Sequence, residues 1–186
     1  MPDNVTIGVV ELSSIYKGFE VQDTLLKRAR VEKLLARTIC SGKYLILVKG
    51  EIGDVETAMQ QARETGGFAI VLAETVSNVH PDVLRALSGT GSLETPEAPG
   101  LLIIETFSVA AAIKAADIAV DEADINLLRI HAAMAIGGKG MILATGDMEA
   151  LQSAADPAIE YLKQDGCLAG FTLLSNPHQD LLKDLV

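Results

Sequence analysis

Short apolar runs alternate with helical patterns along the chain, and this alternation predicts a mixed α/β fold. Residues 5–12 form a β-rich run, and an alanine- and leucine-containing stretch from about residue 17 to 30 predicts a helix. A second predicted helix, at about residues 54–64, carries apolar side chains at helical spacing: Val55, Ala58, Met59 and Ala62. Further strands are predicted at residues 31–39, 44–49 and 68–73, with a short helix from Pro81. The order is βαββαβ followed by a short helix.

The second half of the chain repeats this order. Residues 7–11 align with residues 101–105, which lie 94 positions later. Residues 77–87 align with residues 175–185 at an offset of 98, and six of these eleven positions are identical. Small loop insertions account for the drift in offset, because loops tolerate them. The corresponding elements are predicted at residues 101–105, 108–122, 127–132, 141–144, 148–161 and 168–173.

The repeat predicts two tandem domains of the same architecture. Each is expected to be a ferredoxin-like βαββαβ domain, of the α/β (α+β) class. The first domain is predicted at residues 1–90 and the second at residues 98–186. The segment at about residues 88–98 is rich in Gly, Ser, Thr and Pro, so it is interpreted as the linker.

Composition narrows the range of partners. The chain has 25 acidic and 15 basic residues and a net charge of −10, which argues against nucleic acid as a partner, because the affinity of proteins for nucleic acid comes mainly from Lys and Arg. It has no Trp, so it offers few aromatic side chains on which bases could stack. No run of about 18 uncharged apolar residues is present, so no membrane span is expected. The apolar fraction is nonetheless high, at 49% before glycine is counted, and this surplus indicates large subunit interfaces. Nothing near residue 1 indicates export, and two cysteines fit a reducing cytoplasm.

Four segments of the sequence resemble the bacterial microcompartment shell domain. They are Val-Val-Glu-Leu at residues 9–12, Lys-Arg-Ala-Arg-Val at residues 27–31, the Gly42-Lys43 turn, and the late segment containing His80 or His178. Two such domains in one chain resemble the tandem type, which forms homotrimers that imitate a hexagonal tile, a pseudohexamer. The resemblance implies a structural shell subunit without enzyme activity. It also implies a place in the shell of a cytoplasmic microcompartment, and other shell proteins as partners.

Residues 38–43, Thr-Ile-Cys-Ser-Gly-Lys, are similar to the pore loop of the iron–sulfur type of shell protein found in propanediol-utilising compartments. The resemblance implies that Cys40 from three subunits holds one [4Fe–4S] cluster per trimer, for electron transfer across the shell. Ser41 and Gly42, with Gly137 and Gly138 of the second half, would then line the pore. Encapsulated redox enzymes would be further partners. The loop at residues 136–139 has no cysteine, which agrees with three ligands per trimer.

Two alternatives to the cluster stay open. The trimer could conduct metabolites through its pore with Cys40 as an incidental rim thiol. The chain could instead be a soluble tandem sensor that binds a small effector between its domains, because a fold alone does not fix a function.

Other polar residues receive plainer interpretations. By the resemblance, Lys27 is the lysine that contacts neighbouring tiles at the edge, whereas the second half has Asp121 at that place. The charged stretch at residues 117–124 is interpreted as a solvated helix face. Glu11 and Glu105 are expected to be structural or interfacial, and Cys167 to be a core-facing small residue. His80 and His178 are expected to have structural roles at helix starts, and His131 is assigned no role.

Overall fold

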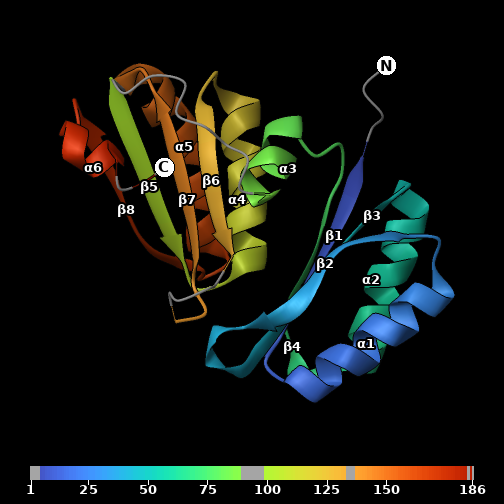
Figure 1. Cartoon of the computed structure of the whole chain (residues 1–186). Coiled ribbons are helices and arrows are strands. Elements are labelled where there is room, and N and C mark those ends of the chain that lie inside the picture. Colours follow the sequence, from blue (N-terminus) through green and yellow to red (C-terminus); the bar gives the residue numbers. More distant parts are fainter. Residues whose placement is uncertain (1–4, 89–98, 133–136, 184, 186) are drawn as a thin grey trace. The chain divides into compact units, whose positions relative to one another are not determined.

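A computed structural model describes residues 5–88, 99–132, 137–183 and 185, which form two compact units (Figure 1). The first unit contains the described residues up to Val79 together with Gly137 and Gly138. The second contains those from His80 to Ala132 and from Lys139 onward. Residues 89–98, most of the predicted linker, lie outside the described residues.

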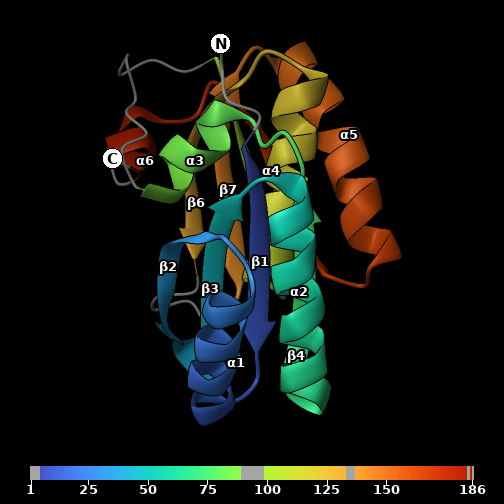
Figure 2. The same cartoon turned by 90° about the vertical axis from the view of Figure 1, so that its right-hand side faces the viewer.

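The first unit is a four-stranded antiparallel sheet with the strand order β2-β3-β1-β4. Its helices α1 and α2 pack on each other and on one face of the sheet (Figure 2). This is the predicted ferredoxin-like βαββαβ arrangement. The elements are β1 (Thr6–Leu12), α1 (Ile15–Arg28), β2 (Glu32–Ile39), a 3₁₀ turn (Cys40–Gly42), β3 (Lys43–Gly50), α2 (Ile52–Gly66), a second 3₁₀ turn (Gly67–Ala69) and β4 (Ile70–Val76).

The second unit has the same architecture, with the strand order β6-β7-β5-β8 and all neighbours antiparallel. Its elements are α3 (Pro81–Ser88), β5 (Gly100–Thr106), α4 (Val109–Glu122), β6 (Asn126–Ala132), β7 (Gly140–Gly146), α5 (Met148–Gln164), β8 (Leu168–Ser175) and α6 (Gln179–Lys183). Helix α3 follows the first repeat in the sequence, yet it packs against β6 and α4 of the second unit.

The core forms where the apolar pattern predicts it. Every residue of β1 is buried, and the helical stripe that includes Val55, Ala58 and Met59 packs under the sheet of the first unit. Helix α4 begins after Ser108, whose hydroxyl oxygen accepts a hydrogen bond from the Ala111 N–H (3.4 Å). Burial of apolar side chains between helices and sheet therefore stabilises each unit.

One predicted strand is displaced along the chain. The strand expected at residues 68–73 is observed at Ile70–Val76. Gly67 has a left-handed backbone (φ 51°), ends α2, and leads into a 3₁₀ turn in which Phe68 is fully exposed. An apolar residue in a turn looks like part of the adjacent strand when only the sequence pattern is considered.

Details of the backbone confirm that the two halves are structural repeats. Strands β2 and β6 both shift register after their second residue, between Lys33 and Leu35 and between Leu127 and Arg129. The turns after β4 and β8 both contain an asparagine with positive φ, Asn78 (54°) and Asn176 (48°). No helix within the described part of the chain is long and apolar enough to cross a membrane.

Candidate functional site

Cys40 lies in the tight turn that joins β2 to β3. The turn comprises Cys40–Gly42 and is kinked, because Ser41 (φ 65°) and Gly42 (φ 72°) both have left-handed backbones. A left-handed serine is uncommon, and two consecutive left-handed residues turn the chain within a very short distance. Cys40 is half-buried. The predicted site residue is therefore the first residue of a sharply bent turn, directly after β2.

The loop before β7 lies against this turn. Gly137 (φ 66°) and Gly138 (φ 81°) have the same left-handed backbone and belong to the first unit. The Ser41 hydroxyl donates a hydrogen bond to the Gly137 carbonyl oxygen (3.1 Å). A Cβ atom at residue 138 would lie 3.1 Å from the Cys40 carbonyl oxygen, so only glycine fits there without displacement. The structure thus brings Ser41, Gly137 and Gly138 together beside Cys40.

An ion pair supports each of these loops where its strand begins. Lys43 Nζ lies 2.7 Å from Glu11 Oε1, and Lys139 Nζ lies 3.1 Å from Glu105 Oε1. The two pairs differ in exposure, because the Glu11 side chain is 0% exposed and that of Glu105 is 44% exposed. The structural or interfacial role expected for both glutamates agrees with these pairs. The lysine partners carry a signal in the sequence that was not used above: both repeats have Gly-Lys at the end of the loop and Glu in the adjacent strand.

The described residues of one chain do not form a metal site by themselves. No group of three or more His, Cys, Asp or Glu side chains gathers within the described ranges. Cys40 and Cys167 form no disulfide. A metal or cluster at Cys40 would therefore need Cys40 from further copies of the chain. Cys40 begins this turn, and a Cβ atom built at Gly42, two residues later, would meet no atom within 4 Å.

The histidines expected at helix starts occupy those positions. His80 Nδ1 accepts a hydrogen bond from the Asp82 N–H (3.3 Å) before α3, and His178 Nδ1 accepts one from the Asp180 N–H (3.2 Å) before α6. The structural interpretation of both histidines is confirmed.

The interpretation of residues 117–124 as a solvated face is wrong for one residue. Asp121, Glu122 and Asp124 are exposed, but Asp117 is buried. Its Oδ1 accepts a hydrogen bond from the His80 backbone N–H (2.9 Å), and burial raises the pKa of its carboxyl group above the usual value. Because α3 covers this turn of α4, the charge pattern alone could not predict the burial.

Two further site predictions have mixed outcomes. Lys27 is exposed and pairs with Asp23 (2.6 Å), and its contact with a neighbouring tile stays a prediction. Cys167, predicted to be a core-facing small residue, is half-buried. Its backbone N–H donates to the Leu162 carbonyl oxygen (2.8 Å) of α5, and its own carbonyl oxygen accepts from the N–H of Phe107 (2.8 Å), directly after β5.

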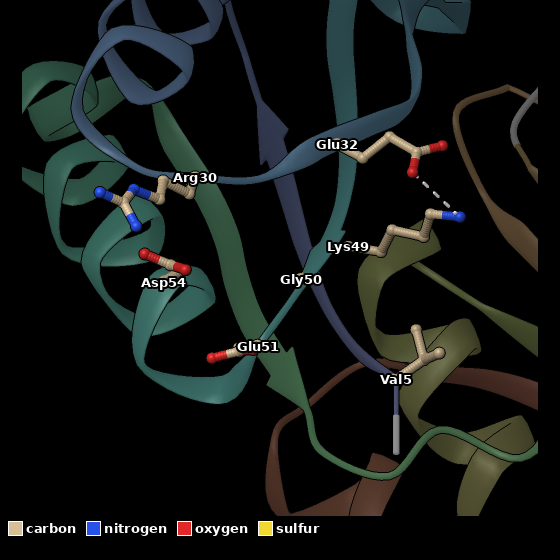
Figure 3. A pocket seen from close by; sticks show the side chains of 7 residues that line it. All are labelled: Val5, Arg30, Glu32, Lys49, Gly50, Glu51 and Asp54. Carbon is tan, nitrogen blue, oxygen red and sulfur yellow. Dashed lines mark ion pairs between the residues drawn. The ribbon is translucent and has the colours of Figure 1, made fainter. Parts of the chain in front are cut away.

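A hollow of about 680 Å³ lies in the first unit, away from the Cys40 loop (Figure 3). Its rim is charged, and one ion pair, between Lys49 Nζ and Glu32 Oε2, measures 3.2 Å. Small-molecule sites are mostly apolar clefts with a few convergent polar groups, which this open, charged hollow does not resemble. The lining residues are Val5, Arg30, Glu32, Lys49, Gly50, Glu51 and Asp54.

Comparisons with known proteins agree with this architecture. The family described as "BMC domain" matches the chain twice, at residues 6–80 and 101–177. The bacterial microcompartment shell protein PduT of Citrobacter freundii is 38% identical over 97% of each chain. The carboxysome shell protein CsoS1C of Halothiobacillus neapolitanus is 31% identical and matches 45% of this chain and 88% of its own length. A crystal structure of a microcompartment protein from Desulfitobacterium hafniense superposes with a TM-score of 0.85 at 33% identity, covering 97% of this chain and 99% of that one.

Proposed function

The chain belongs to the BMC-domain family of bacterial microcompartment shell proteins, and from this premise we propose that it is a trimeric tile whose central pore holds one [4Fe–4S] cluster. The family is structural rather than catalytic, so the protein's primary role is to build a shell. In the proposed tile, three copies of the two-domain chain form a pseudohexamer around a three-fold axis. The function of this tile is electron transfer across the shell.

The single observation that carries the proposal is the position of Cys40. It occurs once per chain, as the first residue of the turn Cys40–Gly42, which contacts the glycine loop of the other repeat through the Ser41–Gly137 hydrogen bond. If loops of both repeats surround a common axis, a residue present once per chain meets two copies of itself there. A three-fold axis thereby provides three thiolates, which no single chain supplies.

Cysteine thiolate chemistry fits an iron–sulfur cluster. Such clusters are held by Cys thiolates, commonly four, so three Cys40 ligands leave one iron for a water or another external ligand. When bound, the cluster would take up or release one electron without any atom crossing the shell. The protein's own contribution would be to hold Cys40 in place, and the Ser41–Gly137 hydrogen bond restrains its loop for that purpose.

The buried ion pair gives this loop a fixed base. Lys43 directly follows the turn, and its ammonium group is held by Glu11 from the central strand β1 at 2.7 Å. A turn anchored on both sides by sheet hydrogen bonds and by this pair moves little relative to the sheet. Such rigidity favours a site that three chains must build to the same geometry.

Two kinds of partner follow from this role. Other shell proteins would surround the tile, with Lys27 at the first-half edge and Asp121 at the corresponding place in the second half. Encapsulated redox enzymes would exchange electrons with the cluster. The competing function is a metabolite-conducting pore in which Cys40 binds no iron, and it predicts the opposite outcome of the following experiment.

The test is anaerobic reconstitution with iron and sulfide, followed by measurement of iron, acid-labile sulfide and visible absorption. We expect about four iron and four sulfide per trimer. Cys40→Ser should abolish the absorption, whereas the matched control Cys167→Ser should retain it, because Cys167 directly precedes β8 and is not part of the Cys40 turn. Iron near zero in the wild-type protein, or unchanged in Cys40→Ser, would contradict the proposal and leave the metabolite pore.

A further inference from the structure

The segments that lead from α1 into β2 and from α4 into β6 carry opposite charges. Residues 27–33, which we call the basic strip, contain four basic side chains and one acidic side chain, a net charge of +3. Residues 121–127, the acidic strip, lie 94 positions later and contain three acidic side chains and no basic one, a net charge of −3. The same offset relates α1 to α4. The two strips are therefore one surface of the repeat with the sign of its charge inverted.

The backbone geometry of the two strips is alike. Each helix ends at an alanine with an extended backbone, Ala29 (φ −125°) and Ala123 (φ −149°), and the N–H of each alanine donates to the carbonyl oxygen four residues earlier. The charged side chains around each alanine are exposed in both strips. Each strip thus presents three charges in the same arrangement: Lys27, Arg28 and Arg30 in the basic strip, and Asp121, Glu122 and Asp124 in the acidic strip.

Most of these charges have no counter-charge within the chain. Lys27 pairs with Asp23 at 2.6 Å, and Glu32, the acidic residue of the basic strip, pairs with Lys49 at 3.2 Å. Among the residues that the structure describes, neither arginine of the basic strip takes part in an ion pair, and neither does any carboxylate of the acidic strip. These groups are therefore available to a charged partner outside the chain.

The neighbouring turns carry charge as well. Arg30 lines the charged hollow together with Glu51 and Asp54, so two carboxylates lie beside the basic strip (Figure 3). The corresponding turn of the second unit carries Asp147 and Glu149, both exposed, and it extends the acidic surface. The contrast in sign between the two units is therefore confined to the strips themselves.

The stability of its own helix does not explain the acidic strip. The C-terminal end of a helix carries a partial negative charge, so cations stabilise this end and anions destabilise it. The last turn of α1 contains two basic residues, whereas that of α4 contains two acidic residues and no basic one. The one basic residue of α4, Lys114, lies about two turns earlier, and its charge acts on Asp117. Carboxylates that destabilise their own helix end indicate a contact with a cationic surface elsewhere.

Both strips lie at the end of their sheet that is opposite to the pore loop. Arg30 is two residues before β2, and Cys40 directly follows that strand. The eight residues of β2 span about 26 Å, at about 3.3 Å per residue. In the second unit, the acidic strip leads into β6, and Gly137 and Gly138 come after the other end of that strand. A three-fold axis at Cys40 therefore leaves both strips away from the contacts of the pore loops.

We propose that the acidic strip of one trimer contacts the basic strip of another trimer, so that tiles of this chain join through edges of opposite charge. The inference rests on the trimer of the proposed function and assigns the partner surface of each edge. A second copy is the partner, because the chain itself supplies the matching charges of +3 and −3. Contacts between strips of the same sign would place like charges together, which is unfavourable. A head-to-tail contact of this kind continues from tile to tile.

The test is assembly of the full chain from dilute trimers to high concentration, followed by light scattering and electron microscopy. The basic-reversed variant carries Lys27→Glu, Arg28→Glu and Arg30→Glu, and the acidic-reversed variant carries Asp121→Lys, Glu122→Lys and Asp124→Lys. Each should raise the critical concentration of assembly by about tenfold or more, because strips of like charge then face each other. The chain with all six substitutions keeps the net charge of −10 and should regain assembly.

A matched control and a mixture separate this contact from general effects of charge. The control carries Asp156→Lys, Glu160→Lys and Asp165→Lys, three exposed positions on α5 and at its C-cap, and changes the net charge as much as the acidic-reversed variant does. It should assemble like the wild type. A mixture of the two reversed variants should assemble although neither does alone, because strips of opposite sign meet again.

The outcomes distinguish the two proposals. An equal effect of the control and the acidic-reversed variant, or a mixture that does not assemble, would overturn the contact between unlike strips. A wild-type trimer that remains a trimer at every concentration would overturn it too, while the proposed function would stand. Dissociation of the reversed variants into single chains would place the strips inside the trimer and contradict a contact between trimers. A wild-type monomer in dilute solution would overturn both proposals.

Discussion

The two halves of this chain place equivalent residues in opposite environments. Glu11 and Lys43 form a buried pair, and their counterparts Glu105 and Lys139 form an exposed one. The reverse holds for the helix aspartates, because Asp117 is buried under α3 and Asp23 is exposed. The comparison shows that the repeat determines which residues meet, whereas the segments packed over them determine how strongly each contact contributes to stability.

The largest expected difference concerns the two lysines. Lys43→Met removes the ammonium group that neutralises the fully buried Glu11 carboxylate, which should lower the free energy of unfolding by about 3–5 kcal/mol. Lys139→Met breaks an exposed pair and should lower it by less than about 1 kcal/mol. Urea unfolding followed by circular dichroism measures both. Equal losses in the two variants would show that the difference in burial has no energetic consequence.

A smaller effect is expected at Asp117. Asp117→Ala removes the acceptor of the partly buried His80 N–H and should lower the free energy of unfolding by about 1–3 kcal/mol. The same unfolding titration at neutral pH measures it. A loss below the experimental error would indicate that α3 is not held at this point.

The pH dependence of the free energy of unfolding reports how the ionisation of Asp117 affects stability. Burial raises the pKa of its carboxyl group, while the unfolded group titrates near about 3.9. The native state therefore binds the proton more readily, and this stabilisation is fully present below about pH 3.9 and is lost as the pH rises through the folded pKa. Relative to Asp117→Asn, the wild-type protein should lose stability as the pH rises from 4. A pH-independent difference would contradict the raised pKa.

The smallest difference between two matched variants is expected at the glycine loop. Gly138→Ala places a Cβ 3.1 Å from the Cys40 carbonyl oxygen, whereas Gly137→Ala meets nothing within 4 Å. Both substitutions put alanine in a left-handed conformation, which costs about 1–2 kcal/mol. We therefore expect Gly138→Ala to lower the unfolding midpoint more than Gly137→Ala. The opposite order would indicate that the two loops do not pack as described.

Much of the fold could be predicted because its determinants are local. The β-rich runs and the helical stripe with Val55, Ala58 and Met59 mark strands and helices without reference to their partners. The repeated pattern then implied one architecture for both halves, and the family match at residues 6–80 and 101–177 agrees with it. The Cys40 turn could also be predicted, because it contains Gly42 and β-rich segments flank it.

The burial differences could not be predicted, because they depend on contacts between distant segments. Nothing in the sequence near Asp117 shows that α3 covers it, and charge spacing alone predicted a solvated face. The Glu11–Lys43 pair joins positions 32 residues apart, on neighbouring strands. Its depth follows from packing around β1, which local periodicity does not specify.

The central claim is that Cys40 of three chains meets at one cluster, and native mass spectrometry of the anaerobically reconstituted protein tests it most directly. The account predicts a species of three 19.6 kDa chains carrying the additional mass of one [4Fe–4S] cluster, which becomes an iron-free trimer in Cys40→Ser. A wild-type trimer of protein mass alone, or one cluster on each single chain, would contradict it.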